Sequence, residues 1–445
     1  MGAGVRERPF EIVIAGGGVA ALEALLALRE LAPKSVQIQL LAPESDFVHR
    51  PMFVAEPFGI GQAQRVKLDE VAADNGAALR RGALASVDAA GRTVATSEGD
   101  EISYDALLVA IGARPVPAVP GALTFGDPSE REFFAALLDQ LGRRRGEQLA
   151  FLVPPEVKWS LAAYELALLT TSYLKARPAE RAKVAVITHE AEPLEMMGAE
   201  PASALRERLR SERVGVETSA VVTSFESGRV QLADGGSIRS DNAVALPALE
   251  VPTIEGLPQR WRGFLPTDTR MHVAGLDRVW AAGDVTWFPV KQGGLAAQQA
   301  QVASKAIAAA AGARVPAASF RPGLRAALLT GAVPLLLESA DLDAGTTWWP
   351  PAKAAGRYLG PYLAAKRHEA APTGRQEAPE GLKETMASEA EHREAVDFAL
   401  AAADSDARLG NLAGALEWLD LVEEMNLVIP PTYAEKRRRW AEAAR

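Results

Sequence analysis

A glycine-rich turn near the start of the chain has the spacing of a dinucleotide-phosphate site. Residues 10–15 form an apolar strand and lead through this turn into an apolar helix over 22–28. Gly16 allows a sharp turn, Gly18 opens the backbone to a pyrophosphate, and Ala21 lets helix and strand pack closely. An ordinary tight turn has the same glycines. We expect the phosphates to be held by Gly16, Gly18, Val19, Ala20 and Ala21, at a helix start whose amides attract anions.

Two later apolar strands also end in small residues. Residues 104–109 lead into Ala110-Ile111-Gly112, and residues 279–282 lead into Gly283-Asp284, which precede an alanine-rich helix. Asp284 is either a hydrogen-bonding carboxylate at a ligand or a solvated residue in a turn. The repetition of strand, small residue and helix favours a second contact with the same ligand.

The composition is that of a folded, soluble enzyme of two or three domains. The chain has 445 residues, 48% of them hydrophobic, and a net charge of −9, which makes nucleic acid an unsuitable partner. There is no cysteine, so disulfides, thiolate metal sites and cysteine nucleophiles are excluded in this chain. The five histidines are scattered, and we predict no metal site. Without a long apolar stretch or a secretion signal, the chain is expected to remain in the cytoplasm.

Strands and helices alternate along most of the chain, which predicts an α/β fold. We expect two Rossmann-like, doubly wound, three-layer domains, the second inserted in the first, followed by a C-terminal α+β segment and a helical tail. That segment contains a strand pair over 324–330 and 334–338 and a helix over 352–366, and the tail contains helices over 389–403 and 412–426. The expected divisions are 5–128 and 242–311 for the first domain, 129–241 for the insertion, 312–368 for the C-terminal interface segment and 380–445 for the helical hairpin tail.

In their order, these motifs resemble the pyridine nucleotide-disulfide oxidoreductase superfamily over residues 8–366. The run 288–299 after Gly283-Asp284 resembles the branch containing sulfide:quinone oxidoreductase, flavocytochrome c sulfide dehydrogenase and type II NADH dehydrogenase. The resemblance implies FAD as cofactor, with Asp284 at the ribityl chain and Ala110 and Gly112 in the turn that returns to the FAD domain. The paired redox cysteines of the sulfide-oxidising members are missing, so their persulfide chemistry is unavailable to this chain.

The same resemblance implies that a helix start lies beneath the flavin pyrimidine ring, at Gly293, Gly294 and Leu295. Lys291 beside it would add positive potential near the flavin N1, which stabilises the reduced, anionic flavin. Lys291 is thus one candidate catalytic residue, and the alternative is a surface residue ahead of a helix. Gln298 and Gln299 either line an acceptor pocket or are polar residues of the helix.

The loop after the second strand runs along the cofactor in this family. His49 is the leading candidate acid or base, Arg50 is expected to meet a phosphate and Pro51 to touch the flavin edge. Where FAD enzymes usually carry an acid for the adenosine ribose, this chain has Ala42, so the contact is assigned to Glu44. Both His49 and Glu44 have the alternative of being loop residues without a role.

The middle domain lacks the glycine turn through which relatives bind NAD(P)H. Pro154 and Pro155 replace the glycines, and proline has no amide to donate. Glu156 would repel a pyrophosphate, which Lys158 offsets in part. We expect the domain to keep its architecture without its nucleotide, while NAD(P)H binding stays open.

Aromatic residues gather where a planar acceptor could enter or where an interface could close. They are Trp287, Phe288, Trp348, Trp349, Tyr358 and Tyr362. Residues 350–367 could rest on the inner face of a membrane, but an interface, as in a homodimer, is the stronger expectation. The helical tail is expected to pack on the main body, a second copy or another protein.

These observations predict an FAD-dependent oxidoreductase that passes electrons from a small donor to a quinone or similar acceptor without cysteine chemistry. One alternative is an NAD(P)H-dependent flavoprotein reductase. The other is a non-catalytic flavin-binding scaffold whose tail binds a partner.

Overall fold

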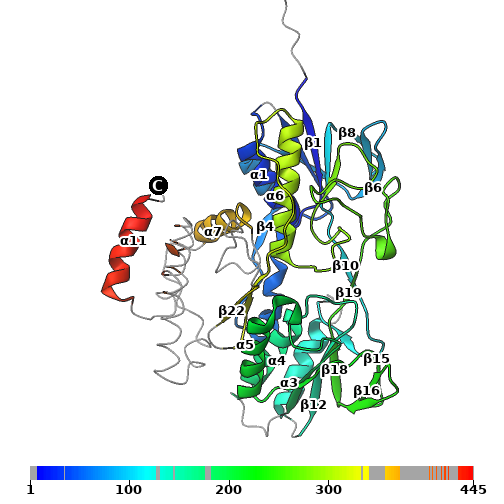
Figure 1. Ribbon diagram of the computed structural model, residues 1–445, viewed down its shortest axis with the longest axis vertical. Helices are drawn as coiled ribbons and strands as arrows, with labels where there is room; N and C mark the ends of the chain where they lie inside the picture. Colours follow the sequence, from blue (N-terminus) through cyan, green and yellow to red (C-terminus); the bar gives the residue numbers. More distant parts are fainter. Residues whose placement is uncertain are drawn as a thin grey trace, which may run out of the picture.

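Two parallel five-stranded sheets form the frame of the chain, as expected for paired Rossmann-like units (Figure 1). The structure is a computed structural model. It describes residues 8–34, 36–126, 131–143, 146–175, 182–331, 334–339, 356–370, scattered positions between 400 and 419, and 429–443. The predicted α/β class, with the second unit inserted in the first, is confirmed.

The first sheet has its strands in the order β20 (Val279–Ala281), β9 (Ala106–Val109), β1 (Glu11–Ala15), β2 (Gln37–Ala42) and β5 (Ala78–Arg81). One face packs on helices α1 (Val19–Leu31) and α6 (Gly293–Ala310), which lie side by side (Figure 1). The other face packs on an antiparallel sheet of β6 (Leu84–Asp88), β7 (Thr93–Thr96) and β8 (Glu101–Ser103). Because both faces are covered, β9 is apolar and fully buried throughout.

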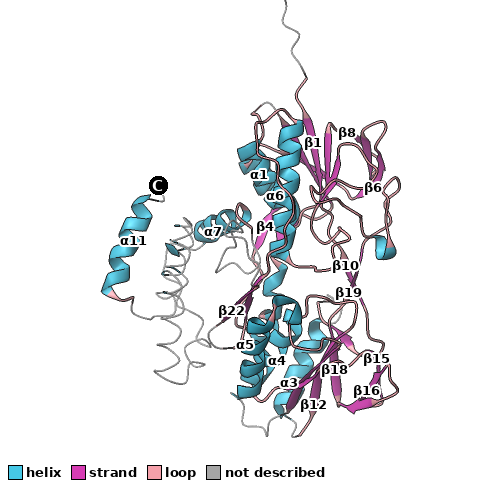
Figure 2. Cartoon of the chain, viewed as in Figure 1, coloured by secondary structure: helices cyan, strands magenta, loops and turns pink. Residues whose placement is uncertain are grey.

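The second sheet repeats this plan in the order β11 (Leu123–Thr124), β18 (Asn242–Ala245), β12 (Gln148–Val153), β13 (Lys183–Thr188) and β14 (Gly215–Glu217). Helices α3 (Arg131–Arg143), α4 (Leu161–Lys175) and α5 (Ala199–Ser211) cover one face. The antiparallel strands β15 (Val222–Glu226), β16 (Arg229–Leu232) and β17 (Ser237–Arg239) cover the other. Figure 2 shows the same layering in both units.

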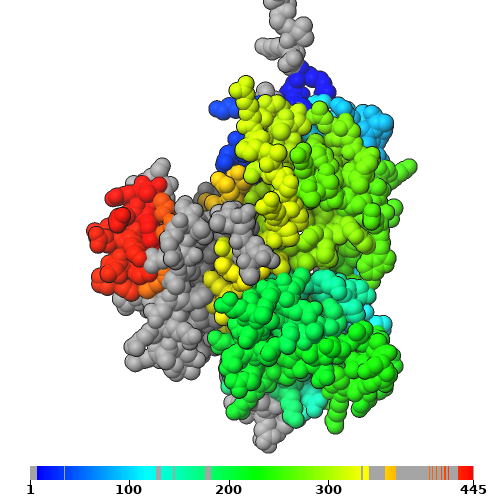
Figure 3. Space-filling view, in the orientation of Figure 1, coloured from blue at the N-terminus to red at the C-terminus, as the bar shows by residue number. Residues whose placement is uncertain are grey.

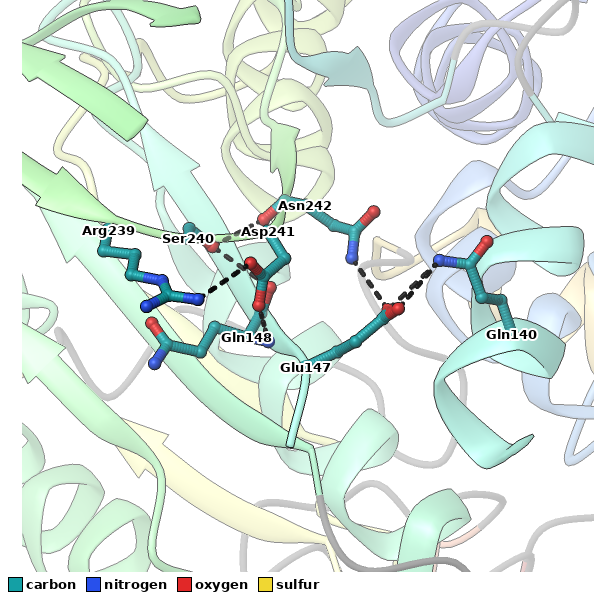
Figure 4. Close-up of polar contacts among 7 residues, drawn as sticks. All are labelled: Gln140, Glu147, Gln148, Arg239, Ser240, Asp241 and Asn242. Carbon is teal, nitrogen blue, oxygen red and sulfur yellow. Dashed lines mark hydrogen bonds and ion pairs between the residues drawn. The ribbon is translucent and has the colours of Figure 1, made fainter. Parts of the chain in front are cut away.

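The expected division at residues 241 and 242 differs from the strand pairing. Strand β18 pairs in parallel with β12 and β11, so it belongs to the second sheet and not to the returning first domain. A polar network at the amino ends of β12 and β18 fixes this pairing (Figure 4). Asp241 accepts from the Gln148 amide at 2.9 Å, and Asn242 donates to Glu147 at 3.2 Å. Likewise β11, before the boundary expected at 128, pairs in the second sheet.

Both chain crossings between the two sheets run through one short ladder. Strand β10 (Arg114–Val116) leaves the first sheet, β19 (Ala248–Glu250) returns to it, and the two pair antiparallel. Figure 3 shows the inserted unit, cyan to green, stacked against the first.

The C-terminal part begins with the expected strand pair, β21 (Arg325–Leu328) and β22 (Leu335–Glu338), which is antiparallel. Helix α7 (Leu359–Ala370) follows and buries Leu359 and Leu363 against the α1–α6 layer. Its first turn is capped by the buried Glu23 of α1, which accepts from the Leu359 amide at 2.7 Å and from Gln301 at 2.6 Å. The last described helix is α11 (Pro431–Ala443), and the predicted tail helices lie almost entirely outside the described residues.

Among the described helices, none combines the length and apolar character that crossing a bilayer requires.

Candidate functional site

The three predicted turns meet at one edge of the first sheet. Strands β20, β9 and β1 are parallel neighbours, so their carboxyl ends lie side by side. The Ala110 amide donates to the Ala15 carbonyl at 2.7 Å, and the Ala282 amide donates to Val109 at 3.1 Å. Segments more than 260 residues apart therefore meet at one edge of the sheet, which is the usual ligand position of an open α/β sheet.

Gly16 and Gly18, in the first turn, differ in whether the fold itself requires a glycine. Gly16 has a φ of +129°, and a Cβ there would lie 2.2 Å from the Ala110 carbonyl oxygen. Gly18 has an ordinary φ of −92° and precedes α1, yet a Cβ there would meet no protein atom within 4 Å. The fold therefore requires glycine at 16, whereas at 18 it leaves open space beside the helix start. Val19, Ala20 and Ala21 form the first turn of α1.

Gly283 occupies a similarly tight position at the end of β20. Its φ is +84°, and an added Cβ would lie 3.0 Å from the Ala20 Cβ. Its amide donates to the side chain of Gln299 at 2.7 Å, across a buried contact with α6. Gln299 therefore holds this turn, and Gln298 holds Gly323 through two hydrogen bonds, so both glutamines have structural partners. These contacts favour the structural reading over an acceptor pocket.

A charged cluster follows this turn. Lys291 donates from Nζ to the carbonyls of Asp284, at 3.1 Å, and Thr286. Its ammonium also lies 3.9 Å from the centre of the Phe264 ring. Burial lowers the pKa of Lys291 to about 8, although the Asp284 carboxylate acts in the opposite direction. Burial raises the pKa of Asp284, and the charges of Lys291 and Arg50 offset part of that rise.

The start of helix α6 is only partly available to a ligand. Gln292 caps it, and its side chain accepts from the Leu295 amide at 2.9 Å. Leu295 thus uses its amide within the protein. The amides of Gly293 and Gly294 have no acceptor in the described part of the chain, so they are the ones left to face a ligand.

The candidate site residues in the loop after β2 differ in their exposure to solvent. His49 is 2% exposed, with its ring 6.3 Å from that of Phe47. Arg50 is exposed at the start of the 3₁₀ helix η1 (Arg50–Val54), and Pro51 is half-buried. Glu44 is exposed beyond β2, and its backbone carbonyl accepts from Arg81. The structure brings Arg50 within electrostatic range of Asp284. Within the described ranges, the Glu44 side chain has no protein partner that would fix it.

Sequence reasoning missed a buried carboxylate in the inserted unit. Glu190 is 4% exposed just past β13, and it accepts from Ser160 at 2.8 Å, Tyr164 at 2.7 Å and Thr188 at 2.9 Å. Burial and this neighbouring carboxylate raise the pKa of Tyr164. Ser160 directly precedes α4, so the carboxylate lies beside the start of that helix. An acid soon after the second strand of a Rossmann-like unit was the available signal.

Two of the aromatic residues predicted to line an acceptor site or an interface lie in different parts of the structure. Trp287 is 42% exposed and its ring lies 6.2 Å from that of Phe264, next to Lys291. Tyr362, on α7, instead donates to Asp74 at 2.7 Å. Trp348 and Trp349 lie outside the described residues.

Comparison with known proteins agrees with this geometry. Residues 10–151 and 160–310 match the family described as pyridine nucleotide-disulphide oxidoreductase. An NADH dehydrogenase-like protein of Mycobacterium tuberculosis is 28% identical over 289 residues, which are 62% of this chain and 72% of that protein.

Solved structures share the fold at lower identity. The sulfide:quinone oxidoreductase of Aquifex aeolicus superposes with a TM-score of 0.69 at 18% identity, covering 81% of this chain and 90% of that one. A chain of the covalent putidaredoxin reductase–putidaredoxin complex gives a TM-score of 0.55 at 17% identity, covering 75% of this chain and 82% of that one.

Proposed function

Because the chain belongs to the pyridine nucleotide-disulphide oxidoreductase family, we propose that it takes electrons from a small donor other than NAD(P)H and passes them through FAD to a quinone or similar acceptor. Family membership makes it an FAD-dependent oxidoreductase. The donor and acceptor are the parts that we propose.

The residues at the edge of the first sheet fit FAD. The open space beside Gly18 and the start of α1 suit a pyrophosphate, and Gly112, at φ +71°, likewise has no protein atom near its Cβ position. We assign the ribityl contact to Asp284 and the pyrimidine contact to the amides of Gly293 and Gly294. Arg50 and Pro51 would cover the same cofactor from the loop after β2.

Lys291 is the residue to which we assign control of the electron transfer. Bound FAD supplies two-electron chemistry that amino-acid side chains lack. Lys291 holds a fixed positive charge beside the turn that carries Asp284, oriented by two backbone carbonyls. A preorganised positive charge of this kind stabilises negative charge that develops beside it. His49, buried in the adjoining loop, is the proposed acid or base.

The single observation that carries the choice of donor is the network around Glu190. The buried Glu190 carboxylate accepts from three hydroxyl groups, one of them that of Ser160 directly before α4. Its negative charge opposes a pyrophosphate at the same place. Pro154 and Pro155 also remove amide donors from the preceding loop. We therefore infer that the inserted unit does not serve as a nicotinamide site.

A quinone-like acceptor is proposed from the surface beside Lys291. Trp287 is exposed there, and an aromatic wall suits a planar, apolar molecule. The Aquifex structure, whose title names a sulfide:quinone oxidoreductase, shares the fold. We further propose a homodimer in the cytoplasm or on the inner face of the membrane, with residues 356–370 at the interface.

The test is an anaerobic titration of the purified, FAD-loaded protein, followed by absorbance. NADH and NADPH should leave the flavin oxidised, whereas a small donor other than a nicotinamide should bleach it, with sulfide and a reduced quinone as the compounds titrated. Bleaching by NADH at about 10 s⁻¹, an ordinary enzymatic rate, would refute the choice of donor. A flavin that no donor reduces would favour the scaffold alternative.

The second candidate is an NAD(P)H-dependent reductase. The similarity to a protein named NADH dehydrogenase-like favours it. The same titration distinguishes the two.

A further inference from the structure

A second pocket lies at the edge of the first sheet that is opposite the proposed FAD site. It has a volume of about 260 Å³ and is bounded by Arg278 and Trp280 around β20 and by the last turns of α6. Arg278 precedes β20, whereas Gly283 follows it, so the two sites are at opposite strand ends. Lys305 is 12 residues beyond the start of α6, about 18 Å along the helix.

The pocket collects positive charge on an acidic protein. Arg270, Arg278 and Lys305 line it with a single carboxylate, Asp277, while the chain as a whole carries −9. Asp277 is already paired with Arg92 at 3.2 Å. The local excess of cations is therefore not neutralised by the wall itself.

Two of these cations have nothing to bind in the described part of the chain. The side chains of Arg270 and Lys305 make no hydrogen bond and no ion pair there. Arg278 instead donates to the Ala310 carbonyl at 3.4 Å, which offsets the negative end of the α6 dipole. Arg270 and Lys305 remain available to a ligand.

A buried aromatic pair forms part of the same wall. Trp280 is 2% exposed, and its indole Nε1 is enclosed, without a hydrogen-bond partner among the residues that the structure describes. Its ring lies 4.8 Å from that of His272, which also lines the pocket and is held by Asp268 at 3.3 Å. The indole nitrogen is itself enclosed, so Trp280 contributes its ring and not a hydrogen-bond donor to the pocket wall.

The remaining wall consists mostly of alanines, among them Ala306, Ala309 and Ala318, so no side chain fills the space. We propose that this pocket binds a small phosphate-bearing molecule, with Arg270 and Lys305 on the phosphate. Guanidinium and ammonium groups together are a usual phosphate-binding pair. The volume suits a small ligand, since it is slightly below the range of drug-sized pockets.

The test uses the FAD-loaded protein and pyrophosphate as the probe, measured by calorimetry. Bound FAD occupies the proposed dinucleotide site, and one pyrophosphate per chain should bind at the new one. The double variant R270Q/K305Q should bind it about tenfold more weakly or worse.

The matched control is K183Q/R213Q, which removes two exposed cations from the inserted unit and changes the net charge equally. It should bind within twofold of the wild type, and flavin absorbance per chain should be unchanged in every variant. Equal weakening by both double variants would overturn the proposal, as would absence of binding. Succinate binding as tightly as pyrophosphate would overturn the assignment to phosphate.

Discussion

The ammonium of Lys291 donates to the backbone carbonyl of Asp284 at 3.1 Å, so the lysine is anchored to the turn that carries the carboxylate. It is not held by an ion pair with the carboxylate itself among the described contacts. The positive charge therefore has a position that is set by the backbone.

Replacement of Lys291 by methionine should make the bound flavin harder to reduce. Loss of about 1–2 kcal/mol of electrostatic stabilisation corresponds to a fall of about 20–40 mV in the two-electron midpoint potential. Because the pKa of Lys291 is about 8, the difference between wild type and K291M should shrink as the pH rises through 8. Dye-coupled anaerobic titration at pH 7 and pH 9 measures both. K183M is the control, and an equal change in it would contradict the assignment.

Alanine at Gly18 should separate cofactor binding from folding. The position has an ordinary φ and open space, so the apoprotein of G18A should unfold within about 1 kcal/mol of the wild type. If the space holds the FAD pyrophosphate, FAD affinity should fall about tenfold or more. Denaturant unfolding and flavin titration give the two numbers.

G59A is the matched control for G18A. Gly59 has a φ of +71° and no atom near its Cβ position, so only local strain of about 1 kcal/mol is expected. G16A should fail in both assays because its Cβ would meet a carbonyl oxygen. Normal FAD affinity in G18A would remove the phosphate assignment.

The alternation of apolar strands and helices allowed much of this fold to be predicted from the sequence. The strands that reach the site, β1, β9 and β20, each lead into a turn containing glycine or alanine. Because parallel strands end at the same edge of a sheet, the meeting of these three turns could be predicted from the sequence. The position of β18 did not follow, because a four-residue apolar strand fits either sheet until its neighbours are known. The network of Glu190 and the Gln299 clamp were likewise unpredictable, since both depend on contacts between elements.

Removal of the Glu190 carboxylate should destabilise the inserted unit without slowing flavin reduction. E190A leaves three buried hydroxyl donors to find new acceptors, at a cost of about 2–5 kcal/mol. E156A removes only the 3.8 Å ion pair with Arg262 and should cost less than about 1 kcal/mol. Urea unfolding compares them. A smaller cost for E190A than for E156A would contradict the structural role of the network.

Glu23 should make stability fall as the pH rises. Burial raises its pKa from an ordinary 4.5 to about 7, despite hydrogen bonds from Leu359 and Gln301 that act the other way. The folded chain therefore holds a proton that the unfolded chain releases between these values, so stability is lost over that interval. The interval corresponds to about 3 kcal/mol.

The variant E23Q should lose this dependence. The free energy of unfolding of E23Q minus that of the wild type should rise by up to about 3 kcal/mol between pH 4.5 and pH 7.5, because only the wild type loses stability over this interval. E30Q, which changes an exposed carboxylate of the same helix, should show no such shift. A difference between E23Q and wild type that is constant with pH would be the contrary result.

The ladder between β10 and β19 limits how the inserted unit can move. Arg114, Pro115 and Val116 pair directly with Glu250, Leu249 and Ala248, so the outgoing and returning segments behave as one ribbon. A ribbon bends readily about an axis in its plane and resists shear between its strands. The two units are therefore joined by one paired ribbon and not by two independent segments, so a displacement of one unit relative to the other has to bend both segments together.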